Sequence, residues 1–116
     1  MWIMTKTGFI SIVQKPDDKT TLTVRARVKG QIESIFPKAK VTSGQGTDYL
    51  YRAKVLRDDV AHAMFAQVMD INYGNFKGAV KDNELHDAYM GCWSVMMRYQ
   101  TAMAPKPRSR QQNLIG

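Results

Sequence analysis

Hydrophobic and polar positions alternate with a period of two residues along much of the first half of the chain, a pattern typical of β-strands. The alternation is clearest in residues 20–28. One face there carries the apolar side chains Leu22, Val24, Ala26 and Val28. Residues 49–55 alternate in the same way, and residues 2–14 are rich in β-branched and aromatic side chains, with Gly8 as an expected bulge or kink. We therefore predict three strands, of which the first two pair as an antiparallel hairpin.

The second half of the chain changes to the spacing of three to four residues that is typical of amphipathic helices. Asp58 or Asp59 can cap a helix that runs to about Asp70. Its apolar side chains recur at Val60, Met64, Val68 and Ile71. A short helical segment is expected around Phe76 and Val80.

The last predicted helix is capped by Asn83, ends before Pro105 and is apolar on two sides. One stripe consists of Leu85, Tyr89, Cys92, Met96, Tyr99 and Met103. The second stripe consists of Met90, Trp93 and Met97. A helix with two apolar sides is either deeply buried or paired with another chain. The second stripe is therefore predicted to be an interface, either within a homodimer or with a host protein.

Residues 30–37 place three apolar side chains at helical spacing, and Pro37 would end such a helix. The predicted order is therefore strand, strand, short helix, strand, helix, helix. This order favours a small α+β domain in which the helices pack on one face of an antiparallel sheet. A ferredoxin-like variant is the nearest familiar arrangement.

Length and composition fit one small globular domain, because the chain has 116 residues of which 44% are hydrophobic and 23% charged. We place the domain at residues 1–104 and expect residues 105–116 to form a disordered basic tail. A single cysteine, Cys92, excludes an internal disulfide. No apolar run is long enough to span a membrane, so we expect a cytoplasmic protein.

The net charge of +7 is unevenly distributed along the chain. Residues 1–57 hold 11 basic and 4 acidic side chains, whereas residues 58–104 hold 3 basic and 6 acidic ones. The excess of positive charge therefore belongs to the predicted sheet and to the tail, and the helical half is mildly acidic.

Strand alternation gathers part of this charge on one face of the sheet. Opposite the apolar positions stand Arg25, Arg27, Arg52 and Lys54. Guanidinium groups bind phosphate oxygens bidentately, so this face is a candidate anion-binding surface. The alternative is an ordinary solvated face, because charged side chains also protect exposed strands from aggregation. Tyr49 and Tyr51 fall on the other face of their strand and are expected to pack against the helices.

The remaining polar side chains show no strong catalytic or metal-binding pattern. His62 and His86 lie on predicted helices, and neither stands at a zinc-ligand spacing from Cys92. Helix capping and the helix dipole explain the acids near His86. Acid–base catalysis by His86 and Asp87 therefore stays a minor alternative, and we expect no cofactor, no metal and no catalytic residue.

Several short segments together carry a resemblance to other proteins. They are residues 1–6, 8–9, 11–14, 24–28, 48–53, 75–77 and 86–89, together with Trp93. Through them the first hundred residues resemble a family of small uncharacterised bacterial proteins of about this length. The resemblance implies no activity, but it brings together Arg25, Arg27, Arg52, Lys77 and His86 as candidates for one polar site.

These observations favour a non-enzymatic protein that binds a phosphate-bearing ligand, either a nucleotide or a nucleic acid. The candidate ligand-binding residues are Arg25, Arg27, Arg52, Lys54, Lys77 and His86. A small basic chain of this kind is also similar to phage accessory or counter-defence proteins. The alternative function is an interaction or inhibitor module that docks on a larger host complex through the last helix.

Overall fold

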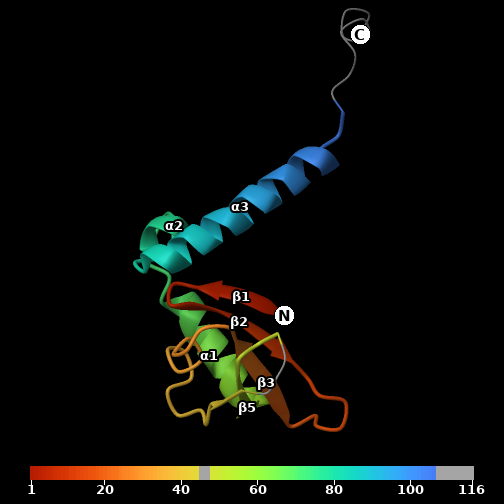
Figure 1. Cartoon of the computed structure of the whole chain (residues 1–116), viewed down its shortest axis with the longest axis vertical. Coiled ribbons are helices and arrows are strands. Elements are labelled where there is room, and N and C mark those ends of the chain that lie inside the picture. The colour runs from red at the N-terminus through yellow and green to blue at the C-terminus, as the bar shows by residue number, and fades with distance from the viewer. Residues whose placement is uncertain (45–47, 107–116) are drawn as a thin grey trace, which may run out of the picture.

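The structure is a computed structural model that describes residues 1–44 and 48–106. Within these residues the strands precede the helices along the chain. The elements are β1 Trp2–Thr5, β2 Gly8–Val13, β3 Thr21–Ala26, β4 Thr42–Ser43, β5 Tyr51–Leu56, α1 Arg57–Met69, α2 Phe76–Ala79 and α3 Asn83–Met103. The strands form one antiparallel sheet in the order β1-β2-β3-β5-β4 (Figure 1). The predicted α+β fold with an antiparallel sheet is therefore confirmed.

The first predicted strand is in fact a tight hairpin. Trp2 pairs with Ser11 and Thr5 pairs with Gly8, so the chain reverses within residues 6–7. The hydroxyl of Thr5 closes this turn: it accepts a hydrogen bond from the Gly8 N–H at 3.1 Å and donates one to the Gly8 carbonyl at 2.9 Å. Gly8 therefore lies at a turn and is not a bulge within one strand.

Residues 30–37, predicted as a short helix, form consecutive turns. The N–H of Ser34 donates to the carbonyl of Gly30 at 3.0 Å, and that of Phe36 donates to Ile32 at 2.8 Å, but the pattern does not continue. Gly30 has a φ of 92°, outside the helical region, and Pro37 has no N–H with which to continue the pattern, so the segment remains a series of turns. The α+β fold holds, but within the described residues no helix separates β3 from β5, so the short helix of the predicted order and its ferredoxin-like arrangement are absent.

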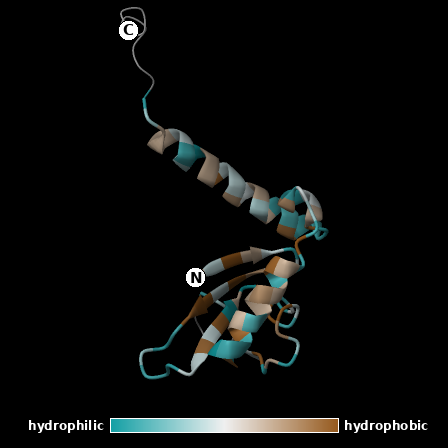
Figure 2. Cartoon of the chain, turned by 180° about the vertical axis from the view of Figure 1, so that it is seen from behind, coloured by the Kyte–Doolittle hydropathy of each residue, from teal (hydrophilic) through white to brown (hydrophobic). Residues whose placement is uncertain are grey.

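The hydrophobic core lies between one face of the sheet and α1, with the turn after β3 closing its side. It consists of Ile10, Ile12, Val24, Ala26, Ile32, Ile35, Phe36, Ala53 and Val60. Figure 2 shows apolar residues along the strands and along α1. Val28 was predicted to share this apolar face, but β3 ends at Ala26 and Val28 is exposed.

Only the first half of α1 covers the sheet. The helix follows β5 without a break, so Asp58 and Asp59 lie in its first turn and neither caps it. Acids in a first turn are favoured by the helix dipole. Val60 is buried and Met64 is half-buried against the core, whereas Val68 is exposed because the helix extends past the sheet.

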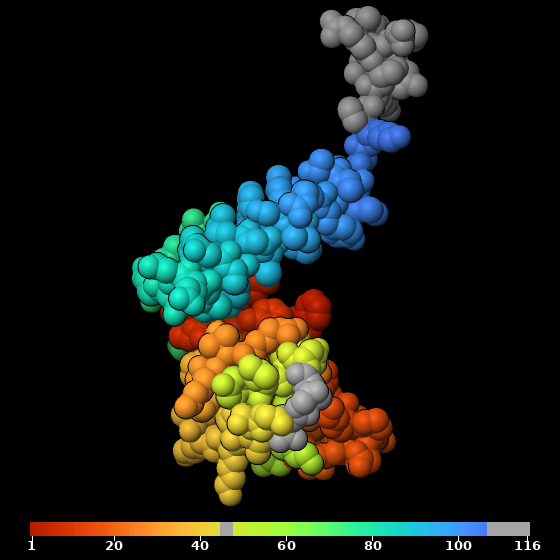
Figure 3. All heavy atoms as spheres, viewed as in Figure 1, coloured from red at the N-terminus to blue at the C-terminus, as the bar shows by residue number. Residues whose placement is uncertain are grey.

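Helix α3 is anchored at its start and then leaves the body of the protein. Asp82, not Asn83, caps it by accepting a hydrogen bond from the N–H of Leu85 at 2.9 Å. The hydroxyl of Tyr89 donates to the carbonyl of Thr5 at 2.9 Å, and the Tyr89 ring stacks on Phe76 at 5.6 Å. Beyond this anchor the helix projects as a separate arm (Figures 1 and 3). The predicted packing of all helices on one sheet face therefore applies to α1 alone.

The arm gives the protein an elongated shape. The radius of gyration is 19.2 Å, compared with about 13 Å for a compact domain of this length. Pro105 follows the end of α3, as predicted. The part of the predicted tail from residue 107 onward lies outside the described residues.

Candidate anion-binding site on the sheet

Arg25 and Arg52 are direct neighbours across β3 and β5, on the sheet face that points away from the core. Ser11 flanks Arg25 on β2, and Thr42 flanks Arg52 on β4. Like charges placed directly opposite each other in a sheet repel. Alternation predicted that Arg25 and Arg52 share this face, and the pairing of β3 with β5 places both charges at its middle.

Tyr49 covers the same face, contrary to the prediction that it packs against the helices. It precedes β5, and its buried ring lies 4.4 Å from the guanidinium carbon of Arg25 and 4.2 Å from that of Arg27. Such cation–π contacts stabilise both the charges and the ring. Tyr51, in contrast, packs against the core as expected.

Arg25 on β3 and Arg27 directly after it are therefore occupied by contacts within the protein. The Nη2 of Arg25 donates to the hydroxyl of Ser11 at 2.7 Å, and the Nη1 of Arg27 donates to the carbonyl of Asp48 at 2.7 Å. Together with the stacking on Tyr49, these bonds hold the segment before β5 onto the sheet. Their first role is structural, and the cations beside them are the stronger candidates for a ligand site.

Those cations surround a hollow of about 470 Å³ beside Arg52. It is lined by Lys15, Thr23, Lys40, Thr42, Arg52, Ala53 and Lys54. We call it the basic hollow. Four of its lining residues are cationic, two carry hydroxyl groups, and among the described lining residues none is acidic. The hollow therefore offers hydrogen-bond donors and positive charge to a ligand that is rich in oxygen.

The hollow forms because strand pairing stops early at this edge of the sheet. The two residues of β4 pair with Tyr51 and Arg52 only, so the rest of β5 runs past the end of β4. Lys54 extends from that part of β5, and the loops after β2 and before β4 contribute Lys15 and Lys40. All three lysines are exposed.

Asp18 lies near these cations, but its carboxylate stabilises the turn before β3. The carboxylate of Asp18 accepts hydrogen bonds from the N–H groups of Thr20 and Thr21, each at 3.0 Å, and from the Thr21 hydroxyl. The hydrogen bonds from Thr21 hold the pKa of Asp18 below its usual value, with a smaller contribution from the positive charge of Lys54.

Lys77 and His86 do not join the arginines. The ammonium of Lys77 lies 4.7 Å from the ring of Trp93, and Nδ1 of His86 lies 3.4 Å from the carboxylate of Asp87. Both residues belong to α2 and the start of α3, which lie beyond β1 (Figure 1). Arg25 and Arg52 lie two and three strands away from that edge. The single polar site implied by the resemblance is therefore divided into two separate clusters.

Two residues of the basic hollow, Lys15 and Lys40, were missed by the sequence analysis because both lie in loops. Strand alternation assigns a face only to residues inside a strand. The one available signal was the pair of basic residues Lys38 and Lys40, which stand close together between Pro37 and β4.

The described residues show two further negative findings. In residues 1–44 and 48–106, no three histidine, cysteine or acidic side chains come together in a way that could hold a metal ion. Among the helices of that same part of the chain, none combines the length and the apolar content needed to cross a membrane.

No family model, no curated protein and no solved structure matches this chain. The resemblance to small bacterial proteins therefore stays a prediction. Any functional proposal rests on the geometry and charge of the residues described above.

Proposed function

We propose that this protein binds a nucleotide-sized ligand through its phosphate groups, in the basic hollow. The observation that carries the proposal is the convergence of Lys15, Lys40, Arg52 and Lys54 on one concave site whose described lining includes no acid. An ordinary solvated sheet face would mix charges of both signs and would present them on an open surface.

The side chains of the hollow suit a phosphate group. The guanidinium of Arg52 presents a planar fork of donors, and lysine ammonium groups act as mobile point charges around it. Thr23 and Thr42 add hydroxyl donors on the sheet itself. The proposed activity is binding, because these groups neutralise and orient a phosphate without attacking it.

The size of the site favours a small ligand over a polymer. At about 470 Å³ the hollow falls within the range of ordinary small-molecule sites. A second hollow of about 540 Å³ adjoins it and shares Lys40 and Lys54. Apolar side chains, among them Phe36, Pro37, Val55 and Leu56, line this second hollow. A ligand whose phosphate lies in the basic hollow would thus place its base or other organic group in the adjoining apolar hollow.

The proposal is tested by titrating adenosine monophosphate, and adenosine as the matched compound without phosphate, into the full chain by calorimetry. We expect saturable binding of the monophosphate only. The double variant Lys40→Ala, Lys54→Ala should weaken that binding about 30- to 150-fold, because each lost charge-assisted hydrogen bond is worth roughly 1 to 1.5 kcal/mol at an exposed site. Both lysines are exposed, so the variant should fold like the parent.

The control is the double variant Lys29→Ala, Lys106→Ala, which removes the same charge from exposed positions outside the hollow. Equal weakening in both variants would show only a general effect of net charge and would contradict a defined site. Failure of the monophosphate to bind the parent would also contradict the proposal. Tight binding of a single-stranded oligonucleotide, with an affinity that falls steeply with salt, would assign the face to nucleic acid instead.

A further inference from the structure

The second half of α3 exposes a largely apolar face, with Gln100 as its polar member. Its large side chains are Trp93 at 49% exposed, Met96 at 58%, Met97 at 43%, Tyr99 at 59% and Met103 at 67%. We call this surface the α3 face. Trp93 and Met97 were predicted as an interface, whereas Met96, Tyr99 and Met103 continue the stripe that Tyr89 buries at the base of the helix.

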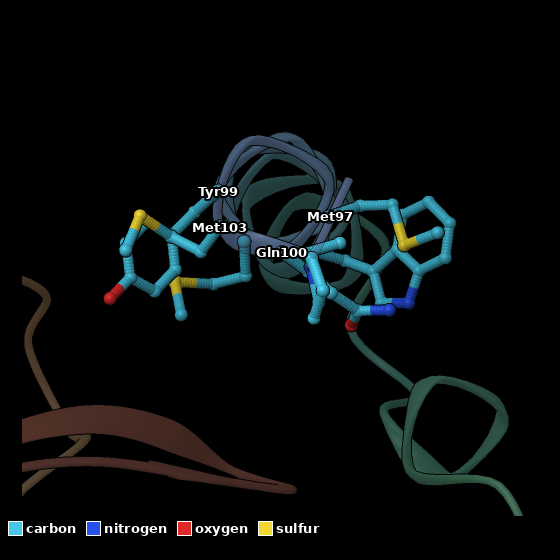
Figure 4. Close-up of a pocket in the computed structure, with 8 residues that line it drawn as sticks. Met97, Tyr99, Gln100 and Met103 are labelled. Carbon is cyan, nitrogen blue, oxygen red and sulfur yellow. The ribbon is translucent and has the colours of Figure 1, made fainter. Parts of the chain in front are cut away.

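The α3 face is shaped as a groove that belongs to one helix. A hollow of about 710 Å³ runs along it, and every described residue that lines it lies between Trp93 and Pro105. Figure 4 shows Met97 on one side of the helix, Tyr99 and Met103 on the other, and Gln100 between them. Ridges of this kind, with a groove between them, are the surface into which a second helix packs.

We propose that the α3 face pairs with the same face of a second copy of this chain, with the two helices antiparallel. The proposal is independent of the basic hollow, which lies on β5 and the loops beside it, at the other side of the sheet from β1.

The area of the α3 face is sufficient for such a pair. At roughly 200 Å² for each large side chain, the exposed fractions of these five leave about 550 Å² per copy. With all of it buried, two copies would cover about 1,100 Å², just above the roughly 1,000 Å² that a biological interface must reach. The same helix half carries one charged side chain, Arg98, so the face suits an apolar partner and not a polyanion.

The distribution of charge along α3 favours antiparallel pairing of the two helices. Its first turns carry Glu84 and Asp87, whereas the basic residues Arg98 and Lys106 lie in or beyond its last turns. A parallel pair would place like charges together. An antiparallel pair brings Lys106 of each copy toward the acidic start of the other helix. It also places the two helix dipoles in opposite directions, which is favourable.

The anchor of α3 fixes where the helices meet. Near Tyr89 the apolar face is already covered by Phe76 and the hairpin, so only the half beyond Met90 is open to a partner. The midpoint of that half falls close to Arg98. At 100° per residue, the side chain of Arg98 points away from the α3 face, so the two arginines of a pair do not oppose each other across it.

The test is the mass of the full chain in solution, measured by light scattering over a range of concentrations. We expect a dimer, at twice the chain mass of 13.2 kDa. The double variant Met96→Glu, Met103→Glu should be monomeric with unchanged helix content, because both side chains are exposed in the single copy. The matched control is Ser94→Glu, Ala102→Glu, which places the same charges about 140° around α3 from the centre of the α3 face and should remain dimeric.

The single cysteine reports the direction of the helices. In an antiparallel pair centred near Arg98, spin labels on the two Cys92 side chains should lie about 20 Å apart. A parallel pair would place them about 10 Å apart. A monomeric parent, a dimer that survives Met96→Glu, Met103→Glu, equal dissociation of the control variant, or the shorter distance would each overturn the proposal. A larger mass explained by another bound protein would assign the face to that partner instead.

Discussion

Tyr49 shows how one side chain outside a strand can decide what a charged surface does. Its ring lies against the guanidinium groups of both Arg25 and Arg27, and it turns two apparent ligand-binding residues into supports for the loop that precedes β5. The alternation of residues 49–55 placed Tyr49 on the core face because the strand was expected to begin there. It begins at Tyr51, and outside a strand the period of two no longer fixes a direction.

Tyr89 makes the stability of the α3 anchor depend on pH. Burial raises the pKa of its phenol to about 12, and the hydrogen bond to Thr5 requires the protonated form. The folded state therefore disfavours the phenolate. The contribution of this group is fully present below the ordinary tyrosine pKa of 10.0 and is lost as the pH rises toward about 12.

The measurement is the free energy of unfolding in urea, for the parent and for Tyr89→Phe, from neutral pH into the alkaline range. At neutral pH we expect Tyr89→Phe to be less stable by about 1 kcal/mol, because it leaves the carbonyl of Thr5 without its buried donor. The difference between the two proteins should shrink above pH 10. A difference that is constant across this range would show that the anchor does not involve the phenol proton.

At the scale of elements, the hairpin depends on a close approach that only glycine permits. A Cβ added to Gly8 would lie 2.6 Å from Cβ and 2.7 Å from Cγ of Gln31. Gln31 cannot simply rotate away, because its Cβ is fixed to the backbone and its amide oxygen accepts a hydrogen bond from the N–H of Phe9 at 3.3 Å. Gly8 therefore joins the hairpin to the turns after β3.

Gly8→Ala should lower the stability of the protein by about 1 to 3 kcal/mol, the usual cost of overpacking. Thermal unfolding followed by circular dichroism measures the effect. Gly78→Ala is the matched control, because nothing lies within 4 Å of its added Cβ and the residue is helical. The control should unfold at the same temperature or slightly higher, since alanine favours a helix over glycine by up to about 1 kcal/mol. Equal unfolding temperatures for both variants would contradict the close approach.

The sequence predicted most accurately the elements that the periodicity of neighbouring residues defines. Alternation located β3 and β5, and helical spacing located α1 and α3 to within a few residues. The hairpin turn at residues 6–7 was missed because a threonine hydroxyl closes it and because Gly8, which follows it, was interpreted as a bulge or kink within one strand. The basic hollow was only half predicted, through Arg52 and Lys54, because the loops that carry Lys15 and Lys40 are placed by tertiary contacts.

At the scale of the whole molecule, two surfaces of different chemistry lie at opposite edges of the sheet. The basic hollow adjoins β4 and β5, whereas the α3 face begins beyond β1. Sites this far apart with no shared partner act additively. The apolar pattern of α3 predicted both stripes, yet a sequence pattern cannot tell whether a stripe is covered by the same chain or by another.

This separation leads to a prediction about the combined variants. Lys40→Ala, Lys54→Ala should leave the mass of the protein in solution unchanged, and Met96→Glu, Met103→Glu should leave the binding of adenosine monophosphate unchanged. Light scattering and calorimetry on both variants provide the measurements. An effect of either variant on the other property would mean that the two surfaces are coupled through the sheet.

The contact between Tyr89 and Thr5 also fixes the direction in which α3 projects. The hydroxyl of Thr5 closes the hairpin turn, and the carbonyl of Thr5 accepts the hydrogen bond from Tyr89. The base of α3 is therefore held by the turn that joins β1 to β2. From Tyr89 to Met103 the helix extends about 21 Å. A tilt of only about 10° at its base would carry its far end through about 4 Å. One residue in a four-residue strand therefore governs where the apolar side chains at the far end of α3 are presented.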